Sequence, residues 1–362
     1  MYCRFFIVKL SYMYLNPFSL SYHRTVFCLF IALLTTLSAC RQEGSSRPDV
    51  SGIDAPIQIR RFERDLFALP TDVRFGAQAA ALQRQYPDFY GLFVSQIMGF
   101  GDANDTARTY PALRDFIQNP DMRFLYDTCM QQYPDLSGLE ADFSQAFRYV
   151  KHYLPATALP QVVSHISAFG PAAVTIEDEL IGINLDMYMG SDFPLYQTPD
   201  FPAYLTRRFQ REYIVPNTLK AYIKGIYTAS EQDLPRLIDH IAYEGKLLYF
   251  LDQVLPDTPD SLKIGYGEQD LAWCAKNEAE IWAFLIDQEL LFNTQSKNFY
   301  KYLDEAPHTS GMPAESPGRV PIWVGWQMVR RYMQTHPNTT FEQLMALKDG
   351  QALLKAAKYK PK

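Results

Sequence analysis

The stretch that decides the fold is QVVSHISAFGPAAVTIEDELIGINLDMYMG, residues 161–190. It is rich in β-branched residues, and the dipeptide Gly170-Pro171 marks a turn inside it. This composition predicts strands over Gln161–Phe169 and Ala173–Gly190. We therefore expect a small sheet near the middle of the chain, with other structure on both sides.

Patterns of helical period flank this stretch. Within Arg74–Tyr153, apolar residues recur at intervals of three and four, the period of an amphipathic helix. Helical patterns return over Pro202–Phe292, and a late helix is expected over Gly318–Met333. The order of helices, a small sheet and further helices predicts a single α+β domain, predominantly helical, spanning residues 57–362.

Composition excludes several classes of protein. The chain has 362 residues, of which 48% are hydrophobic and 20% charged, so it has enough apolar surface for a core. Its net charge of −6 argues against sequence-independent nucleic-acid binding, which depends on Lys and Arg. No apolar run reaches the roughly 20 residues that span a bilayer, which excludes a polytopic membrane protein.

The N-terminus carries the features of a secretory signal. The basic Arg24 precedes nine apolar residues, Val26–Leu34, and small residues follow in LSAC, which ends at Cys40. LSAC resembles the bacterial lipobox, in which the cysteine becomes the lipidated first residue. We therefore predict a signal peptide over residues 1–39, lipid attachment at Cys40, and a lipidated N-terminus and linker over residues 40–56.

The first candidate site residues lie on a helix expected over Ser230–Leu255. Glu244 falls inside the apolar stripe of this helix, and His240 falls at its border one turn earlier. A carboxylate that faces a core is costly unless it is paired, so Glu244 requires a partner.

A second expected helix, from about Asp270 to Phe292, carries Glu278 in the middle of its apolar stripe with Asn277 beside it. The simplest interpretation is that each buried acid makes a structural hydrogen bond or ion pair, with Arg319, Arg330 or Lys246 as partners. The alternatives are a ligand-binding cleft and a catalytic site. The sequence has no HExxH motif, no GxSxG elbow and no phosphate-binding or dinucleotide-binding glycine loop.

Taken together, the motifs resemble the GldB family of gliding-motility lipoproteins of Bacteroidetes, over about residues 57–347. The matching segments are the lipobox at Leu37–Cys40, RRFERDLF at Arg60–Phe67, IGINLDMYMGSDFPLY at Ile181–Tyr196, HIAYEGKLLYFLDQVLPD at His240–Asp257, WCAKNEAEIWAF at Trp273–Phe284, and SPGRVPIWVGWQMVRRYM at Ser316–Met333. The resemblance implies a link to gliding and to the secretion apparatus that serves it.

The family is also similar to predicted zinc peptidases, which implies a zincin-like arrangement of a small central sheet packed by helices. In those peptidases the helix after the sheet carries HExxH. If Glu244 matches the glutamate of that motif, Tyr243 and Leu247 stand where histidines belong; if His240 matches the first histidine, Glu244 stands at the second. Either alignment lacks a zinc ligand, even though Asn277-Glu278 resembles the place that supplies an acidic one.

We therefore expect a non-enzymatic lipoprotein with no metal, no cofactor and no catalytic residue. His240, Glu244, Asn277, Glu278 and Arg319 are its candidate degenerate cleft, in which the two acid-bearing helices face one another and share one network. The expected partners are envelope proteins of the gliding or secretion machinery, with no nucleic acid. The expected location is the cell envelope, lipid-anchored to the membrane and facing the periplasm. The alternatives are a peptide- or protein-binding module and a hydrolase with Glu244 as its base.

Overall fold

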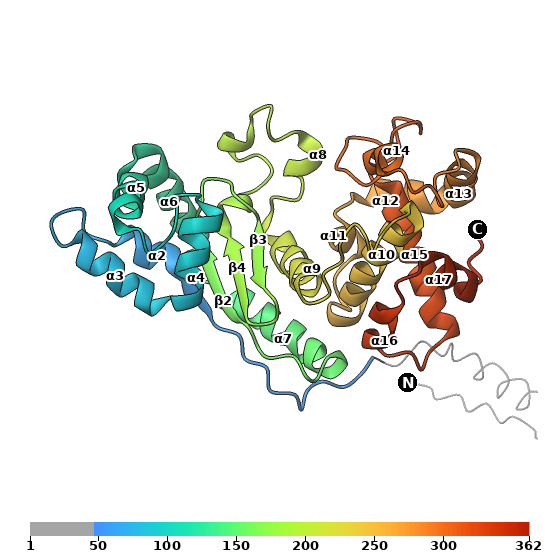
Figure 1. The fold of residues 1–362 in the computed structure, drawn as a ribbon, viewed down its shortest axis with the longest axis horizontal. Helices are drawn as coiled ribbons and strands as arrows, with labels where there is room; N and C mark the ends of the chain where they lie inside the picture. The colour runs from blue at the N-terminus through green and yellow to red at the C-terminus, as the bar shows by residue number, and fades with distance from the viewer. Residues whose placement is uncertain (1–46, 362) are drawn as a thin grey trace, which may run out of the picture. The chain divides into compact units, whose positions relative to one another are not determined.

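The computed structural model describes residues 47–361, which form one compact unit from Val50 onward. The predicted signal peptide and Cys40 lie outside the described residues. A four-stranded mixed sheet with the order β1-β2-β4-β3 lies near the middle of Figure 1. Its strands are β1 (Ile59–Arg61), β2 (Gln161–His165), β3 (Ala173–Ile176) and β4 (Leu180–Asn184).

The sheet is shorter and more finely divided than the sequence predicts. β1 and β4 both pair parallel with β2, whereas β3 pairs antiparallel with β4. The predicted strand Ala173–Gly190 is a hairpin followed by a 3-10 turn, because the polar run after Ile176 turns the chain at Glu177, where φ is 40°. The β3–β4 hairpin therefore occupies one edge of the sheet, and β1 occupies the other.

One group of helices precedes most of the sheet in the sequence, and a second group follows it. The first group is α2 (Phe62–Phe67), α3 (Phe75–Gln85), α4 (Pro87–Gly91), α5 (Thr106–Gln118), α6 (Pro120–Gln132) and α7 (Ser137–Tyr153). The second group is α8 (Ala203–Thr206), α9 (Ile214–Ile226), α10 (Leu237–Val254), α11 (Asp260–Ile264), α12 (Glu268–Lys276), α13 (Glu278–Asp287), α14 (Ser296–Phe299), α15 (Val320–Thr335), α16 (Phe341–Ala346) and α17 (Gly350–Ala357). α9 packs between β3 and α10, and α15 and α17 pack on the far side of α10 (Figure 1).

The architecture confirms the predicted α+β class with a predominance of helix. The zincin-like arrangement stays a prediction. One predicted helix is too long at its start: α10 begins at Leu237 rather than Ser230. The preceding residues form a turn instead, in which Asp233 accepts hydrogen bonds from the backbone N–H of Ser230 at 3.1 Å and from its hydroxyl at 2.8 Å.

The helices α10 and α15 cross with their backbones in contact. Gly245 of α10 faces Gly325 of α15, and a Cβ atom added to Gly325 would lie 2.5 Å from the carbonyl carbon of Ile241. A Cβ atom added to Gly245 would lie 2.8 Å from the backbone nitrogen of Trp326. The two glycines therefore permit a closer helix approach than any other residue pair allows.

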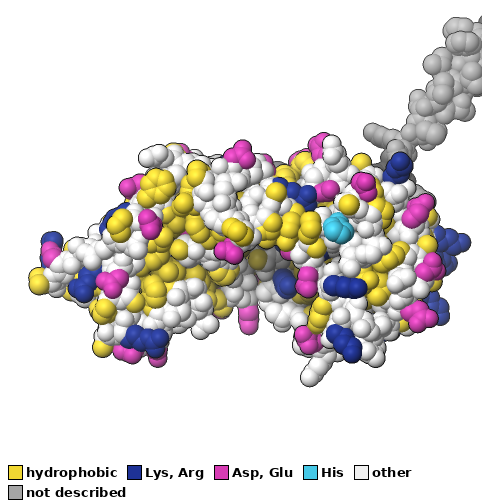
Figure 2. All heavy atoms as spheres, turned by 90° about the horizontal axis from the view of Figure 1, so that it is seen from above, with side chains coloured by type: hydrophobic (Ala, Val, Ile, Leu, Met, Phe, Trp, Pro, Cys, Tyr) yellow, Lys and Arg dark blue, Asp and Glu magenta, His cyan; other side chains and the backbone are white. Residues whose placement is uncertain are grey.

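Two cysteines of the described chain are free and fully buried: Cys129 in α6 and Cys274 in α12. Burial raises the pKa of both thiols, which keeps them protonated and unreactive. No helix between residues 47 and 361 has the length and apolar character needed to cross a membrane. Figure 2 shows hydrophobic side chains gathered over the N-terminal helices, whereas acidic and basic side chains are interspersed over the C-terminal helices.

Candidate functional site

A pocket of about 640 Å³ opens between α9, α10, the start of α15 and the segment after α14. Two of its walls are helices whose polar side chains stand on one face. Asn217, Lys220 and Lys224 are one turn apart on α9, and His240 and Glu244 are one turn apart on α10. The pocket is therefore lined by polar side chains from helices that are separate in the sequence.

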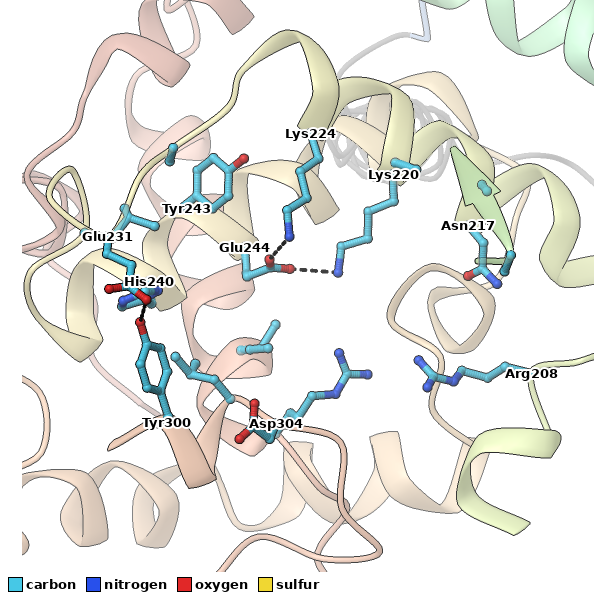
Figure 3. A pocket seen from close by; sticks show the side chains of 18 of the residues that line it. Arg208, Asn217, Lys220, Lys224, Glu231, His240, Tyr243, Glu244, Tyr300 and Asp304 are labelled. Atoms are coloured by element: carbon cyan, nitrogen blue, oxygen red, sulfur yellow. Dashed lines mark hydrogen bonds and ion pairs between the residues drawn. The ribbon is translucent and has the colours of Figure 1, made fainter. Parts of the chain in front are cut away.

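An ion pair joins the two helices at the centre of this pocket. Lys220 Nζ lies 2.8 Å from Glu244 Oε2, and Lys224 Nζ lies 3.9 Å from Glu244 Oε1. Figure 3 shows both lysines reaching from α9 toward the carboxylate. Glu244 and Lys220 are mostly buried, with 18% and 23% of their side chains exposed, whereas 60% of Lys224 is exposed.

The charge of Glu244 is fixed by these neighbours. Burial alone raises its pKa, but the attraction of Lys220, its hydrogen bond to the carboxylate, and the charges of Lys224 and Arg319 outweigh burial and hold the pKa below its usual value. A carboxylate with a lowered pKa is a weak proton acceptor at neutral pH. Glu244 is therefore suited to hold a cationic group in place rather than to abstract a proton.

A second carboxylate is shared between two cations in the same way. Glu305 Oε1 lies 2.9 Å from Arg208 Nη1 and 3.1 Å from Arg319 Nη2. Arg208 and Arg319 both line the pocket, and only 19% and 11% of their side chains are exposed. Burial lowers the pKa of Arg208, although the guanidinium stays charged.

The opposite side of the pocket is aromatic and acidic. His240 packs against the rings of Phe299 and Tyr300, and the Tyr300 hydroxyl donates a hydrogen bond of 2.9 Å to Glu231. Burial lowers the pKa of His240, so its ring is neutral at neutral pH. Figure 3 shows Glu231 and Tyr300 on the side away from Arg208, with Asp304 between Tyr300 and Arg208. The pocket thus has a cationic end and an acidic end.

The structure brings three of the five predicted cleft residues together: His240, Glu244 and Arg319 line the pocket. Asn277 and Glu278 lie elsewhere, because the predicted helix from Asp270 to Phe292 breaks at Asn277. There φ is −110° and the side-chain amide donates a 2.7 Å hydrogen bond to the carbonyl oxygen of Trp273. The break ends α12 and starts α13, which turns Glu278 away from α10.

The predicted network between the two acids is therefore wrong. Glu278 accepts a hydrogen bond from the hydroxyl of Tyr359, near the C-terminus, whereas Glu244 pairs with the lysines of α9. The predicted cationic partners are also engaged elsewhere. Arg330 forms a fork with Asp252 and Asp260, and Lys246 donates to the carbonyl oxygen of Leu347 at 2.8 Å.

Sequence analysis missed the cations that surround Glu244. Lys220 and Lys224 stand four residues apart in IVPNTLKAYIKGI, the otherwise apolar sequence of α9. Two lysines on one face of an apolar helix indicate an acidic partner across the packing interface. Arg208 lies in an irregular segment, where periodicity gives no signal.

The pocket also bears on metal binding. Within residues 47–361, no group of three His, Cys, Asp or Glu side chains lies together as a set of metal ligands. The oxygens of Glu244, which either alignment to the peptidase motif would use, are contacted by two ammonium groups. A divalent cation at this carboxylate would be repelled by Lys220 and Lys224.

One comparison with known proteins gives a match. A family model described as "Gliding motility protein GldB" matches residues 43–361, a range that includes all of the described residues. Neither a curated protein nor a solved structure matches the sequence.

Proposed function

Since this chain belongs to the gliding motility protein GldB family, we propose that it is a membrane-tethered lipoprotein that acts without catalysis in gliding motility and its associated secretion machinery. The match over residues 43–361 is the observation that carries the proposal, because it covers the folded body. We further propose that lipid on Cys40 anchors this body in the cell envelope of a Bacteroidetes host, facing the periplasm, and that envelope proteins are its partners.

The chemistry of the pocket supports a role without catalysis. The hydrolase alternative requires Glu244 to act as a general base. The lysines of α9 hold its pKa below the usual value, which weakens a base at neutral pH. Their ammonium groups also contact both oxygens of the carboxylate, at 2.8 and 3.9 Å.

The pocket itself favours a second candidate function, a peptide- or protein-binding module with a degenerate peptidase cleft. Its volume of about 640 Å³ falls in the range of ligand-binding pockets, which is roughly 300–1,000 Å³. Aromatic side chains and charged groups of both signs line it. This candidate is compatible with the first, because a tethered binding module can serve the machinery through its ligand.

The tether is tested by Cys40→Ala expressed from the native locus. We expect this variant to incorporate no labelled fatty acid and to leave the membrane fraction, because one residue carries the anchor. Stable anchoring requires more than one acyl chain, so a partial loss of lipid also releases the protein. Continued labelling of the variant contradicts the lipobox assignment.

The role without catalysis is tested by Glu244→Gln, which keeps the shape of the side chain and removes its basicity. We expect cell spreading and the amount of secreted protein to stay at wild-type levels. Affinity capture of the lipidated wild type, followed by identification of the co-purifying envelope proteins, provides the partner readout. A folded Glu244→Gln protein that restores neither spreading nor secretion would contradict this expectation and favour the hydrolase or the binding module.

A further inference from the structure

The charged groups of the pocket are separated by sign. Arg208, Lys220 and Arg319 line one end, where Lys220 binds Glu244 and the two arginines share Glu305. Each carboxylate at this end thus serves two cations, once Lys224 is counted with Glu244. This end keeps an excess of positive charge and of unused N–H donors, since a guanidinium carries several donors.

The other end carries the opposite sign. Glu231 and Asp304 line it, both are exposed to solvent, and the only hydrogen bond to the Glu231 side chain within the described residues comes from the neutral hydroxyl of Tyr300. No salt bridge involves either carboxylate in the described part of the chain, which leaves both open to a cationic ligand. The walls between the two ends include Tyr243, Leu303 and Ile322, which suit an organic chain.

The backbone at Arg319 gives an independent sign of a binding site. Arg319 has φ 60°, in the left-handed region, which costs a residue other than glycine about 1–2 kcal/mol. The preceding Gly318 is pressed against the backbone of Ala306, where an added Cβ atom would lie 3.1 Å from the carbonyl carbon. Strain of this kind persists only where the surrounding structure holds the backbone in place, and here it fixes the position from which the Arg319 side chain enters the pocket.

The donors at the cationic end are side-chain groups that can bind a carboxylate, and the start of the nearby helix α15 adds no free backbone N–H for a phosphate. A phosphate site is commonly built from the free N–H groups of a helix N-terminus. At the start of α15, the Val320 N–H is taken by the hydroxyl of Thr309 at 3.2 Å, and Pro321 has no N–H. The remaining donors are planar guanidinium groups and an ammonium, and guanidinium groups match the two oxygens of a carboxylate.

We propose that this pocket binds a short peptide by both of its charged ends. The C-terminal carboxylate of the peptide lies against Arg208, Lys220 and Arg319. The N-terminal ammonium of the peptide lies against Glu231 and Asp304. The proposal deepens the binding-module candidate and does not depend on a role in gliding. It concerns peptide capture only and includes no bond cleavage.

The first test uses matched peptides and the full-length lipidated chain in detergent micelles, followed by calorimetry. The probes are di-, tri- and tetra-alanine with free ends, each compared with its C-terminal amide and its N-acetyl form. We expect at least one free peptide to bind, and each blocked form to bind at least about tenfold more weakly, which equals about 1.4 kcal/mol. Equal binding of a blocked form, displacement by equimolar inorganic phosphate, or no binding at all overturns the proposal.

The second test pairs variants with these peptides. Lys220→Met is expected to weaken the free peptide at least about tenfold and to leave the weak binding of the amide unchanged. Lys276→Met, at an exposed lysine of α12 outside the pocket, is the matched control. Glu231→Gln is expected to weaken the free peptide but not its N-acetyl form. A Lys220→Met loss equal for the free and amidated peptides overturns the assignment of the carboxylate end.

Arg319→Gly separates binding from folding. Glycine adopts positive φ without strain, so the variant keeps the start of α15 while it removes the guanidinium. We expect Arg319→Gly to lose binding of the free peptide while its melting temperature stays close to that of the wild type. If Arg319→Gly does not fold, Lys220→Met provides the test of binding. If the wild type binds the peptide but Cys40→Ala leaves gliding unaffected, the tethered role alone is refuted. If Cys40→Ala abolishes gliding but the wild type binds no peptide, the peptide site alone is refuted.

Discussion

Gly325→Ala is the sharpest test of the packing that positions the pocket. The new methyl carbon would lie 2.5 Å from the carbonyl carbon of Ile241 and 3.0 Å from its Cβ atom. Carbon atoms pack best at about 3.5–4.0 Å, so α15 and α10 must separate by about 1 Å. Neither side can yield by a rotamer change, because the obstacle on α10 is mainly backbone.

The cost follows from this geometry. Overpacking a core costs about 1–3 kcal/mol when side chains can adjust, and backbone against backbone falls at or above the upper end. Alanine returns up to about 1 kcal/mol through its better helix propensity. We expect a net loss of about 3 kcal/mol in the free energy of unfolding, a large share of the 5–15 kcal/mol typical of a native protein. This corresponds to a fall of about 4–5 °C in the melting temperature of a body of this size.

The assay is thermal and urea unfolding followed by circular dichroism. Gly91→Ala is the matched control, because Gly91 is also a helical glycine and has open space around its Cβ position. We expect the control to be neutral or up to about 1 kcal/mol more stable. A Gly325→Ala protein that melts within about 2 °C of the wild type would show that α10 and α15 are not held by this crossing.

Three further predictions follow from the ionisable groups. Glu244→Ala and Glu278→Ala are expected to lower the free energy of unfolding additively, because the two acids have different partners. In a double-mutant cycle the coupling energy is expected to stay within about 0.5 kcal/mol. A larger coupling energy would support the shared network predicted from sequence. Arg330→Met is expected to cost about 1–3 kcal/mol in urea unfolding, because Asp252 and Asp260 lose the guanidinium while Lys263 still lies 3.1 Å from Asp252; a loss below about 0.5 kcal/mol contradicts this. Burial lowers the pKa of His165 from 6.5 to about 3, so the stability that depends on its neutral ring is present above pH 6.5 and is lost as the pH falls toward 3. His165→Leu is expected to reduce this loss of stability at low pH. A melting temperature with the same pH profile in the variant and the wild type would refute the prediction.

The sequence predicted the elements whose signal is local. The β-branched run before Gly170 and the hydrophobic period through Val150 and Leu251 place strands and helices where the structure has them. The position of Glu244 on a buried helix face was also predictable, because it depends only on the spacing within α10. These features follow from the period of the backbone and need no knowledge of neighbouring elements.

The remaining features depend on tertiary contacts or on single side chains. β1 pairs with β2 across about 100 residues, and three-residue strands have no period to detect. The break at Asn277 depends on one amide that bonds the Trp273 carbonyl oxygen, which a hydrophobic pattern cannot show. The partners of Glu244 come from α9, and which helix faces which is decided by packing between elements. The sequence therefore placed the acid correctly but not its cations.

The two buried thiols can be used to measure local opening of the protein. A thiol reagent reaches Cys129 or Cys274 only when α6 or α12 opens, so each labelling rate measures the frequency of one local opening. Mass spectrometry of labelled peptides would separate the two sites without any introduced probe. If α12 opens more often than α6, Cys274 reacts first, and peptide bound in the pocket would slow its labelling only if the ligand also steadies that half of the molecule.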